Sequence, residues 1–168
     1  TLDEAAERCR ITFPRALTPG QWRLRLAFRG ALNDKLRGFY RSTYKDASGA
    51  IHTLAATQFE ATDARRAFPC WDDPAVKATY EVTLVVPSDL VAISNMPVVS
   101  ETPRADGTKA VHFAETPKMS TYLVAFIVGD FVPVEQRHPS GALVRVWATR
   151  GREEQGRFAL ESAVKLLT

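Results

Sequence analysis

Residues 57–78, TQFEATDARRAFPCWDDPAVKA, form the stretch of this chain whose residue types could best do chemistry. Gln58 and Glu60 are two positions apart, so their side chains leave the same face if a strand continues through them. An amide oxygen and a carboxylate on one face can both accept hydrogen bonds from an ammonium group, which leaves its third proton for another partner. The spacing therefore suits a receptor for an amine.

The same segment supports a second interpretation. Its acidic and basic residues could neutralise one another in a loop network made of Glu60, Asp63, Asp72, Asp73, Arg65, Arg66 and Lys77. A long irregular segment inside a sheet domain is usually either functional or a packed connection. Spacing alone leaves both interpretations open.

Nothing in the sequence predicts a metal site or a catalytic residue. A zinc site needs three or four ligands, usually with two of them close together in the chain. The histidines, His52, His112 and His138, are far apart, and the two cysteines, Cys9 and Cys70, form no CxxC motif. Cys70 stands between Pro and Trp, where a cysteine is more often a small buried apolar residue than a nucleophile.

The compartment is predicted from the same cysteines and from the first residues. The N-terminus, TLDEAAERCR, lacks the basic-then-apolar layout of a signal peptide. Without a secretory context we expect Cys9 and Cys70 to be free thiols, and we expect a cytoplasmic location.

The composition is that of an ordinary globular protein. The 168 residues are 45% hydrophobic and 24% charged, with 22 Lys+Arg against 19 Asp+Glu, a net charge of +3. The longest apolar run, residues 123–129, is far too short to span a membrane. The charge excess is small, and no basic run is interleaved with stacking aromatics, so neither a nucleic acid nor a membrane is an expected partner.

Alternation of apolar and polar residues predicts a chain made mostly of strands. It is clearest at residues 21–29, QWRLRLAFR, and it also occurs at 9–13. Further strands are predicted at 36–44, 51–59, 78–86, 97–104, 108–113, 121–128, 132–137 and 142–148. The Asp106-Gly107 pair between two of them is a strong hairpin signal.

The period changes near the C-terminus. From Glu153 onward, apolar residues recur at helical spacing, at Ala159, Leu160, Ala163, Val164 and Leu167. This stripe has little to pack on among the predicted strands. We therefore expect residues 1–150 to be a β-domain truncated at its start, and 151–168 to be the truncated first helix of a following domain.

Four collinear stretches resemble one known family. They are residues 57–78 and, in the same order as in the family, GALNDKLRGFYRS at 30–42, AISNMPV at 92–98 and KMSTYLVAFIVGDF at 118–131. Together they closely resemble the N-terminal domain of M1 zinc aminopeptidases of the aminopeptidase N type, and most of all the puromycin-sensitive branch. One small departure is Asp73, where the family usually has Glu.

The resemblance implies an all-β fold, an antiparallel, saddle-like β-sandwich, with one C-terminal helix leading to a missing catalytic domain. In that family the residues matching Gln58 and Glu60 bind the free α-amine of a peptide substrate. The resemblance also implies zinc in the intact protein, with ligands and catalytic motifs beyond this chain. The chain alone is then expected to be inactive, with peptide substrates and the catalytic domain as its partners. The alternative is a non-catalytic β-sandwich binding or scaffold module.

Overall fold

A computed structural model describes residues 1–46 and 48–167. The elements in chain order are β1 (Leu2–Asp3), β2 (Arg8–Cys9), β3 (Gly38–Lys45), β4 (Ile51–Gln58), η1 (Ala64–Arg66), β5 (Lys77–Ala78), β6 (Thr83–Pro87), β7 (Val91–Ser94), β8 (Val98–Pro103), β9 (Thr108–Phe113), β10 (Met119–Ser120), η2 (Thr121–Leu123), β11 (Phe126–Gly129), β12 (Phe131–Arg137), β13 (Leu143–Thr149), η3 (Glu153–Gly156) and α1 (Arg157–Leu166). The ladders between these strands are antiparallel. The predicted all-β class with one C-terminal helix is confirmed.

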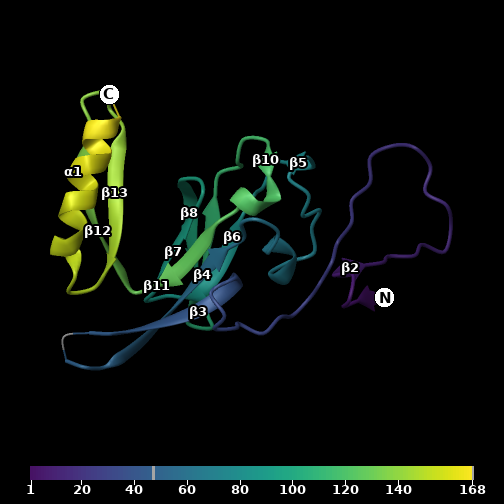
Figure 1. The fold of residues 1–168 in the computed structure, drawn as a ribbon, viewed down its shortest axis with the longest axis horizontal. Helices are drawn as coiled ribbons and strands as arrows, with labels where there is room; N and C mark the ends of the chain where they lie inside the picture. The colour runs from purple at the N-terminus through teal and green to yellow at the C-terminus, as the bar shows by residue number, and fades with distance from the viewer. Residues whose placement is uncertain (47, 168) are drawn as a thin grey trace.

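Two sheets form the centre of the molecule (Figure 1). One has four strands in the order β3-β4-β11-β7, and the other has three in the order β6-β9-β8. A buried apolar cluster joins them: Val86, Val111 and Phe113 come from the three-stranded sheet, and Ala92 comes from β7 of the four-stranded sheet. Because both sheets contribute to one core, they pack as the two layers of a sandwich.

In hairpin β3–β4, β3 is the edge strand of the four-stranded sheet and β4 lies between β3 and β11. The register of the hairpin runs from Lys45 opposite Ile51 to Gly38 opposite Gln58. A second buried cluster lies where β4 ends, built from Phe59, Ala64 and Val124. The chain leaves the sheet at this point and enters the irregular segment that contains η1.

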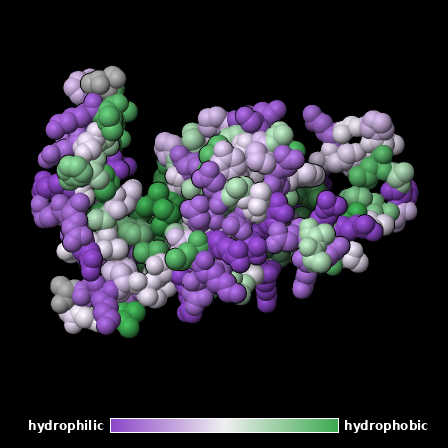
Figure 2. Space-filling model, in the orientation of Figure 1, coloured by the Kyte–Doolittle hydropathy of each residue, from purple (hydrophilic) through white to green (hydrophobic). Residues whose placement is uncertain are grey.

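Two strand predictions near the N-terminus are wrong. Of the first, predicted at 9–13, only Cys9 lies in a strand, β2, and residues 21–29 pair with no other strand of the described chain. Their alternating side chains remain exposed, with Trp22 at 62% and Phe28 at 56%, and Figure 2 shows hydrophobic residues on the surface of this end of the molecule. Alternation describes a surface that fits a sheet, but a strand also needs a neighbour for its backbone groups.

Two other predicted strands are interrupted by side-chain hydrogen bonds. In the stretch predicted at 78–86, the Tyr80 amide donates to Thr116 Oγ1 at 3.0 Å, and the ladder resumes only at β6. In the stretch predicted at 121–128, the first three residues form η2, and the Thr121 hydroxyl is 2.6 Å from the Tyr80 hydroxyl. The Thr116 hydroxyl thus takes the bond from the Tyr80 amide that a neighbouring strand would have accepted, and the Thr121 hydroxyl ties η2 to the Tyr80 side chain.

The C-terminal helix has a partner within the chain, contrary to the expectation from its sequence. Helix α1 lies along hairpin β12–β13, and Leu160 is buried there (Figure 1). The preceding turn approaches the hairpin closely, because a Cβ on Gly156 would lie 2.9 Å from Val134 Cγ2. Leu160 is buried and Ala163 and Val164 are half-buried, whereas Ala159 and Leu167 of the predicted stripe remain exposed. No helix in the described part of the chain is both long and apolar enough to cross a membrane.

Candidate functional site

Gln58 and Glu60 lie on either side of a buried aromatic residue. Gln58 is the last residue of β4 and Glu60 begins the following turn, and both are exposed. Phe59 between them is only 2% exposed. Since successive side chains alternate along extended backbone, burying Phe59 turns its two neighbours toward solvent.

Aromatic packing fixes this position. The ring of Phe59 meets Phe68 and Phe126 edge to face, each at a centroid distance of 5.9 Å. Phe126 belongs to β11, the strand beside β4, and Phe68 follows η1. Edge-to-face pairs of this kind add to the apolar burial of each ring. Phe59 thus anchors the end of β4 to both the sheet and the irregular segment.

After Glu60 the chain turns into η1. The Glu60–Ala61 peptide is cis, and the Asp63 amide donates to the Phe59 carbonyl at 2.8 Å. Ala64 is fully buried beneath the turn. These contacts bring Arg65 and Arg66 close to the end of β4.

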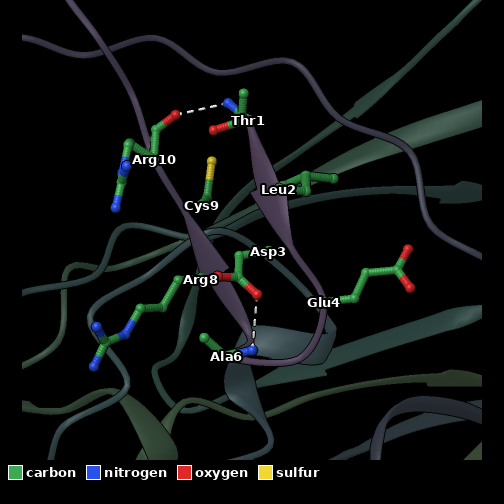
Figure 3. A pocket seen from close by; sticks show the side chains of 8 residues that line it. All are labelled: Thr1, Leu2, Asp3, Glu4, Ala6, Arg8, Cys9 and Arg10. Carbon is green, nitrogen blue, oxygen red and sulfur yellow. Dashed lines mark hydrogen bonds between the residues drawn. The ribbon is translucent and has the colours of Figure 1, made fainter.

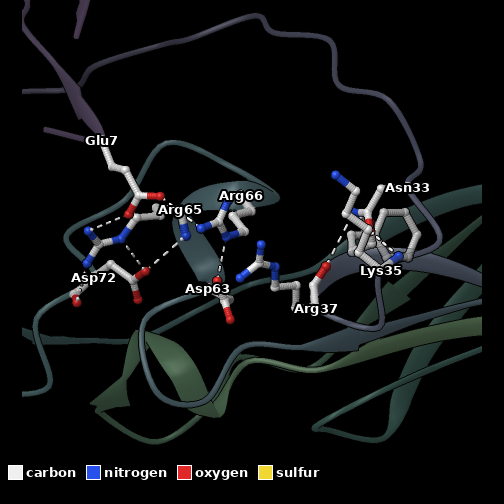
Figure 4. A network of polar contacts seen from close by, with 9 residues as sticks. Glu7, Asn33, Lys35, Arg37, Asp63, Arg65, Arg66 and Asp72 are labelled. Carbon is white, nitrogen blue, oxygen red and sulfur yellow. Dashed lines mark hydrogen bonds and ion pairs between the residues drawn. The ribbon is translucent and has the colours of Figure 1, made fainter. Parts of the chain in front are cut away.

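A network of ion pairs surrounds η1 (Figure 4). Asp72 Oδ2 accepts hydrogen bonds from the backbone amide of Arg65 at 3.1 Å and from its Nε at 2.9 Å. Asp63 pairs with Arg66, and the carboxylate of Glu7 bridges both arginines, at 3.3 Å to Arg65 and 2.9 Å to Arg66. The hydrogen bonds that Arg65 donates to Asp72 and Arg66 donates to Asp63 raise the pKa of each guanidinium group.

This network includes only some of the acidic residues that the sequence offers. Asp63 and Asp72 neutralise arginines, as the second interpretation expected, and Asp73 Oδ1 accepts a hydrogen bond from the Ala75 amide at 2.9 Å. Within the described residues, the carboxylate of Glu60 has no hydrogen bond and no ion pair, and the side-chain amide of Gln58 has none either. Both groups are available to a ligand.

Each histidine has a polar side-chain partner. His52 Nε2 lies 2.7 Å from Asp46 Oδ2, His112 lies beside Thr83 and Glu81, and His138 Nδ1 lies 2.8 Å from the Ser140 hydroxyl. No three His, Cys, Asp or Glu side chains gather within residues 1–46 and 48–167 as a metal ion would require. The described residues therefore do not fit a zinc site.

The cysteines are free thiols. Cys9 is exposed and Cys70 is partly buried against the Phe59 cluster. Burial, followed by the nearby charge of Asp72, raises the pKa of the Cys70 thiol to about 11. Such a thiol is almost entirely protonated at neutral pH, which removes Cys70 as a candidate nucleophile.

Two surface pockets stand out, and the larger one is not lined by Gln58 or Glu60. It measures about 720 Å³ and follows hairpin β1–β2, where the Thr1 amine donates to the Arg10 carbonyl at 2.8 Å (Figure 3). The smaller pocket, of about 210 Å³, is lined by Asn33, Lys35, Arg37 and Arg66. It is therefore next to the ion-pair network.

Sequence reasoning missed two contributors to this region. Glu7 lies 58 positions before Arg65, and no local pattern relates the two. Asn33 shapes the loop before β3, because its side chain donates to the Phe39 carbonyl at 3.1 Å and accepts from the Lys35 amide at 2.7 Å. An Asn-Asp pair ahead of a strand is a recognisable turn signal and could have indicated this second contributor.

Comparison with known proteins gives a consistent result. The family described as the peptidase M1 N-terminal domain matches residues 1–123. The chain is 50% identical over 168 residues to a puromycin-sensitive aminopeptidase of Caenorhabditis elegans, covering 99% of this chain and 18% of that protein. It is 54% identical over 158 residues to aminopeptidase M1-A of Oryza sativa, covering 94% of this chain and 18% of the relative.

A bacterial relative agrees. Aminopeptidase N of Acetobacter pasteurianus is 42% identical over 167 residues, covering 99% of this chain and 47% of that protein. The chain thus spans about a fifth of the nematode and plant relatives and about half of the bacterial one. Matches of this extent, on an antiparallel β fold, show that the chain belongs to the peptidase M1 N-terminal domain family.

Proposed function

We propose that this chain is the substrate-anchoring N-terminal domain of a zinc aminopeptidase that removes N-terminal residues from peptides. The observation that carries the proposal is the state of Glu60. Its carboxylate is exposed and unpaired in the described chain, although Arg65 and Arg66 lie a few residues away and pair with other acids. A carboxylate kept only for structure would be expected to join that network.

The chemistry of an exopeptidase suits these two side chains. A free α-amine is an ammonium group with three donors and a positive charge, and a peptide bond in mid-chain has neither. The carboxylate of Glu60 and the amide oxygen of Gln58 supply two acceptors, one of them charged. Holding the ammonium there fixes the first residue of the substrate and excludes internal peptide bonds.

Rigid support favours the same role. Glu60 follows a side chain locked between two aromatic rings, and Ala64 and the η1 network hold the chain beyond it. A site on such a frame positions its ligand more closely than one on a free loop. In the proposed intact enzyme this domain forms one wall of the site, and the remaining polypeptide forms the other.

The metal belongs to the proposed intact enzyme and not to these residues. Zinc would activate water and polarise the scissile carbonyl from ligands outside this chain. We therefore propose that the 168-residue chain alone neither holds zinc nor hydrolyses peptides. Its cytoplasmic location remains a prediction from the sequence.

The alternative is a non-catalytic binding or scaffold module with the same fold. The two acceptors without a partner weigh against it, because a scaffold has no use for an exposed carboxylate that takes no part in the neighbouring ion pairs. A parent polypeptide without zinc-ligand motifs after residue 168 would favour this alternative.

The test is substitution of Glu60 in the full-length aminopeptidase. Glu60→Ala removes one charge-assisted hydrogen bond, worth roughly 1.5–3 kcal/mol, so kcat/KM should fall by about ten- to a hundredfold. Glu60→Gln should lie between, because its amide oxygen still accepts a bond. Glu115→Ala, at another exposed glutamate, is the matched control. Loss of zinc or of folding in Glu60→Ala, or an effect within about twofold, would refute the proposal.

A further inference from the structure

The smaller pocket is strongly basic. Three of its four lining residues, Lys35, Arg37 and Arg66, are cations, and the fourth is Asn33. Figure 4 shows Arg37 lying between Arg66 and the loop that carries Asn33 and Lys35. The side chain of Asn33 holds that loop, since it donates to the carbonyls of Arg37, at 3.3 Å, and Phe39. The backbone that carries Arg37 is therefore held in place, and the rim of the pocket is positively charged.

Most of that charge is not neutralised. In the described part of the chain, the side chains of Lys35 and Arg37 form no ion pair, and the neighbouring Asp34 pairs with Arg41 at 3.4 Å. Arg66 alone has acidic partners, Asp63 and Glu7. Two cations thus face the pocket without a counter-charge from the protein.

The neighbouring arginines already hold a carboxylate. Glu7 Oε1 lies 2.9 Å from Arg66 and its Oε2 lies 3.3 Å from Arg65. Glu7 comes from the turn of hairpin β1–β2, far away in the sequence. Its bridging position demonstrates that this basic surface accepts a carboxylate presented from outside η1.

The pocket is also next to the proposed amine site. Gly38, which follows Arg37, pairs directly with Gln58. On its other side Gly38 is in close contact with Arg66, because a Cβ at Gly38 would lie 2.8 Å from Arg66 Cβ. Neighbouring strands are about 4.8 Å apart, and an extended peptide advances about 3.3–3.6 Å per residue. A peptide held by its amine at Gln58 and Glu60 can thus bring its second or third residue to the pocket.

We propose that the pocket of Lys35, Arg37 and Arg66 binds a carboxylate of the peptide substrate and gives the site a preference for acidic or short peptides. This inference rests on the proposed function of Gln58 and Glu60. The carboxylate is either the side chain of Asp or Glu near the N-terminus or the C-terminus of a peptide of two or three residues. Both present the same group to the same cations.

Matched peptides in the full-length aminopeptidase test this. Peptides with Glu or Gln at the second or third position report on a side-chain carboxylate, and short peptides with free or amidated C-termini report on the terminal one. The readout is the ratio of kcat/KM for the peptide that carries the carboxylate to kcat/KM for its neutral partner. We expect Arg37→Ala and Lys35→Ala to lower the ratio by about three- to tenfold in at least one pair, and Arg37→Glu to bring it below one.

Control variants separate this inference from the proposed function. Arg104→Ala, at an exposed arginine on hairpin β8–β9, should leave the ratio unchanged. Glu60→Ala should slow both members of each pair alike, so a Glu60 variant without effect would refute the amine site and not the pocket. Ratios that stay at wild-type values in Arg37→Ala, Lys35→Ala and Arg37→Glu would overturn the carboxylate pocket, whatever Glu60→Ala does.

Discussion

Asp72 holds Arg65 through both its backbone amide and its guanidinium group, with one carboxylate oxygen accepting both hydrogen bonds. The Asp72 side chain is only 4% exposed, so its carboxylate is largely shielded from water. Because the backbone of η1 is bonded as well as a side chain, Asp72 fixes the course of the chain just after Glu60.

Asp72→Ala should therefore destabilise the domain. Two N–H donors of Arg65 lose their acceptor, so the free energy of unfolding should fall by about 1–3 kcal/mol. The lower end of this range is expected because Arg65 remains partly exposed. Urea unfolding followed by tryptophan fluorescence measures it. Asp89→Ala, at an exposed turn residue, should change the midpoint little. Equal midpoints for the two variants would mean that Asp72 does not hold η1.

Gly38 is the point where β3 touches η1, and it should not tolerate a side chain. Its φ is +69°, and an added Cβ would lie 2.8 Å from Arg66 Cβ. Gly107 has a similar φ of +79° but open space around it, so Gly107→Ala isolates the backbone strain of about 1–2 kcal/mol. Gly38→Ala should lower the free energy of unfolding by roughly 1–3 kcal/mol more than Gly107→Ala does, because of the close contact with Arg66. Equal losses in denaturant melts would show that η1 yields to the added methyl group.

The hairpin β3–β4 should weaken in acid through Asp46. Hydrogen bonds from the hydroxyl of Ser48 and from His52, with the amides of Ala50 and Ser48, hold the pKa of the Asp46 carboxyl well below its usual value. Because the pKa of Asp46 is lower in the folded state than in the unfolded state, the ionised carboxylate stabilises the fold at pH values above the unfolded pKa of about 3.9. This stabilisation is lost as the pH falls from there toward the lower pKa of the folded state.

Comparing the thermal stability of Asp46→Asn with that of the wild type tests the direction of this pH dependence. The wild type should have the higher Tm at pH 6, and the difference should shrink progressively between about pH 4 and pH 2. Asp89→Asn, which removes an exposed carboxylate outside the hairpin, serves as the control. A difference that grows on acidification would mean that the ionised Asp46 does not stabilise the fold.

The sequence predicted the fold well where local signals and pairing partners coincide. Asp106 and Gly107 do form the turn of a hairpin, with Asp106 Oδ1 accepting from the Thr108 amide at 3.1 Å and Gly107 at positive φ. It failed for residues 21–29, where alternation was strong but no strand lies alongside. Periodicity indicates which face of a segment is apolar and which is polar, whereas strand pairing depends on what the rest of the chain brings next to the segment.

The site could be predicted only in part. The spacing of Gln58 and Glu60 predicted side chains on one face if a strand continued through both residues. Strand β4 ends at Gln58, and the two side chains are exposed on either side of the buried Phe59. Which acids neutralise Arg65 and Arg66 was not predictable, since the carboxylate of Glu7 reaches them from the N-terminal hairpin. Glu60 takes no part in these ion pairs, and its unpaired carboxylate is the feature on which the proposed function depends.

A thermodynamic cycle between Glu60 and the substrate amine tests the central claim most directly. Two inhibitors that differ only in an α-amino group are measured against the full-length wild type and Glu60→Ala. If Glu60 holds the amine, the variant should bind the amino inhibitor about ten- to a hundredfold more weakly and the des-amino inhibitor almost as well as the wild type does, a coupling of roughly 1.5–3 kcal/mol. Equal losses for both inhibitors, or no loss for either, would contradict an amine anchor at Glu60.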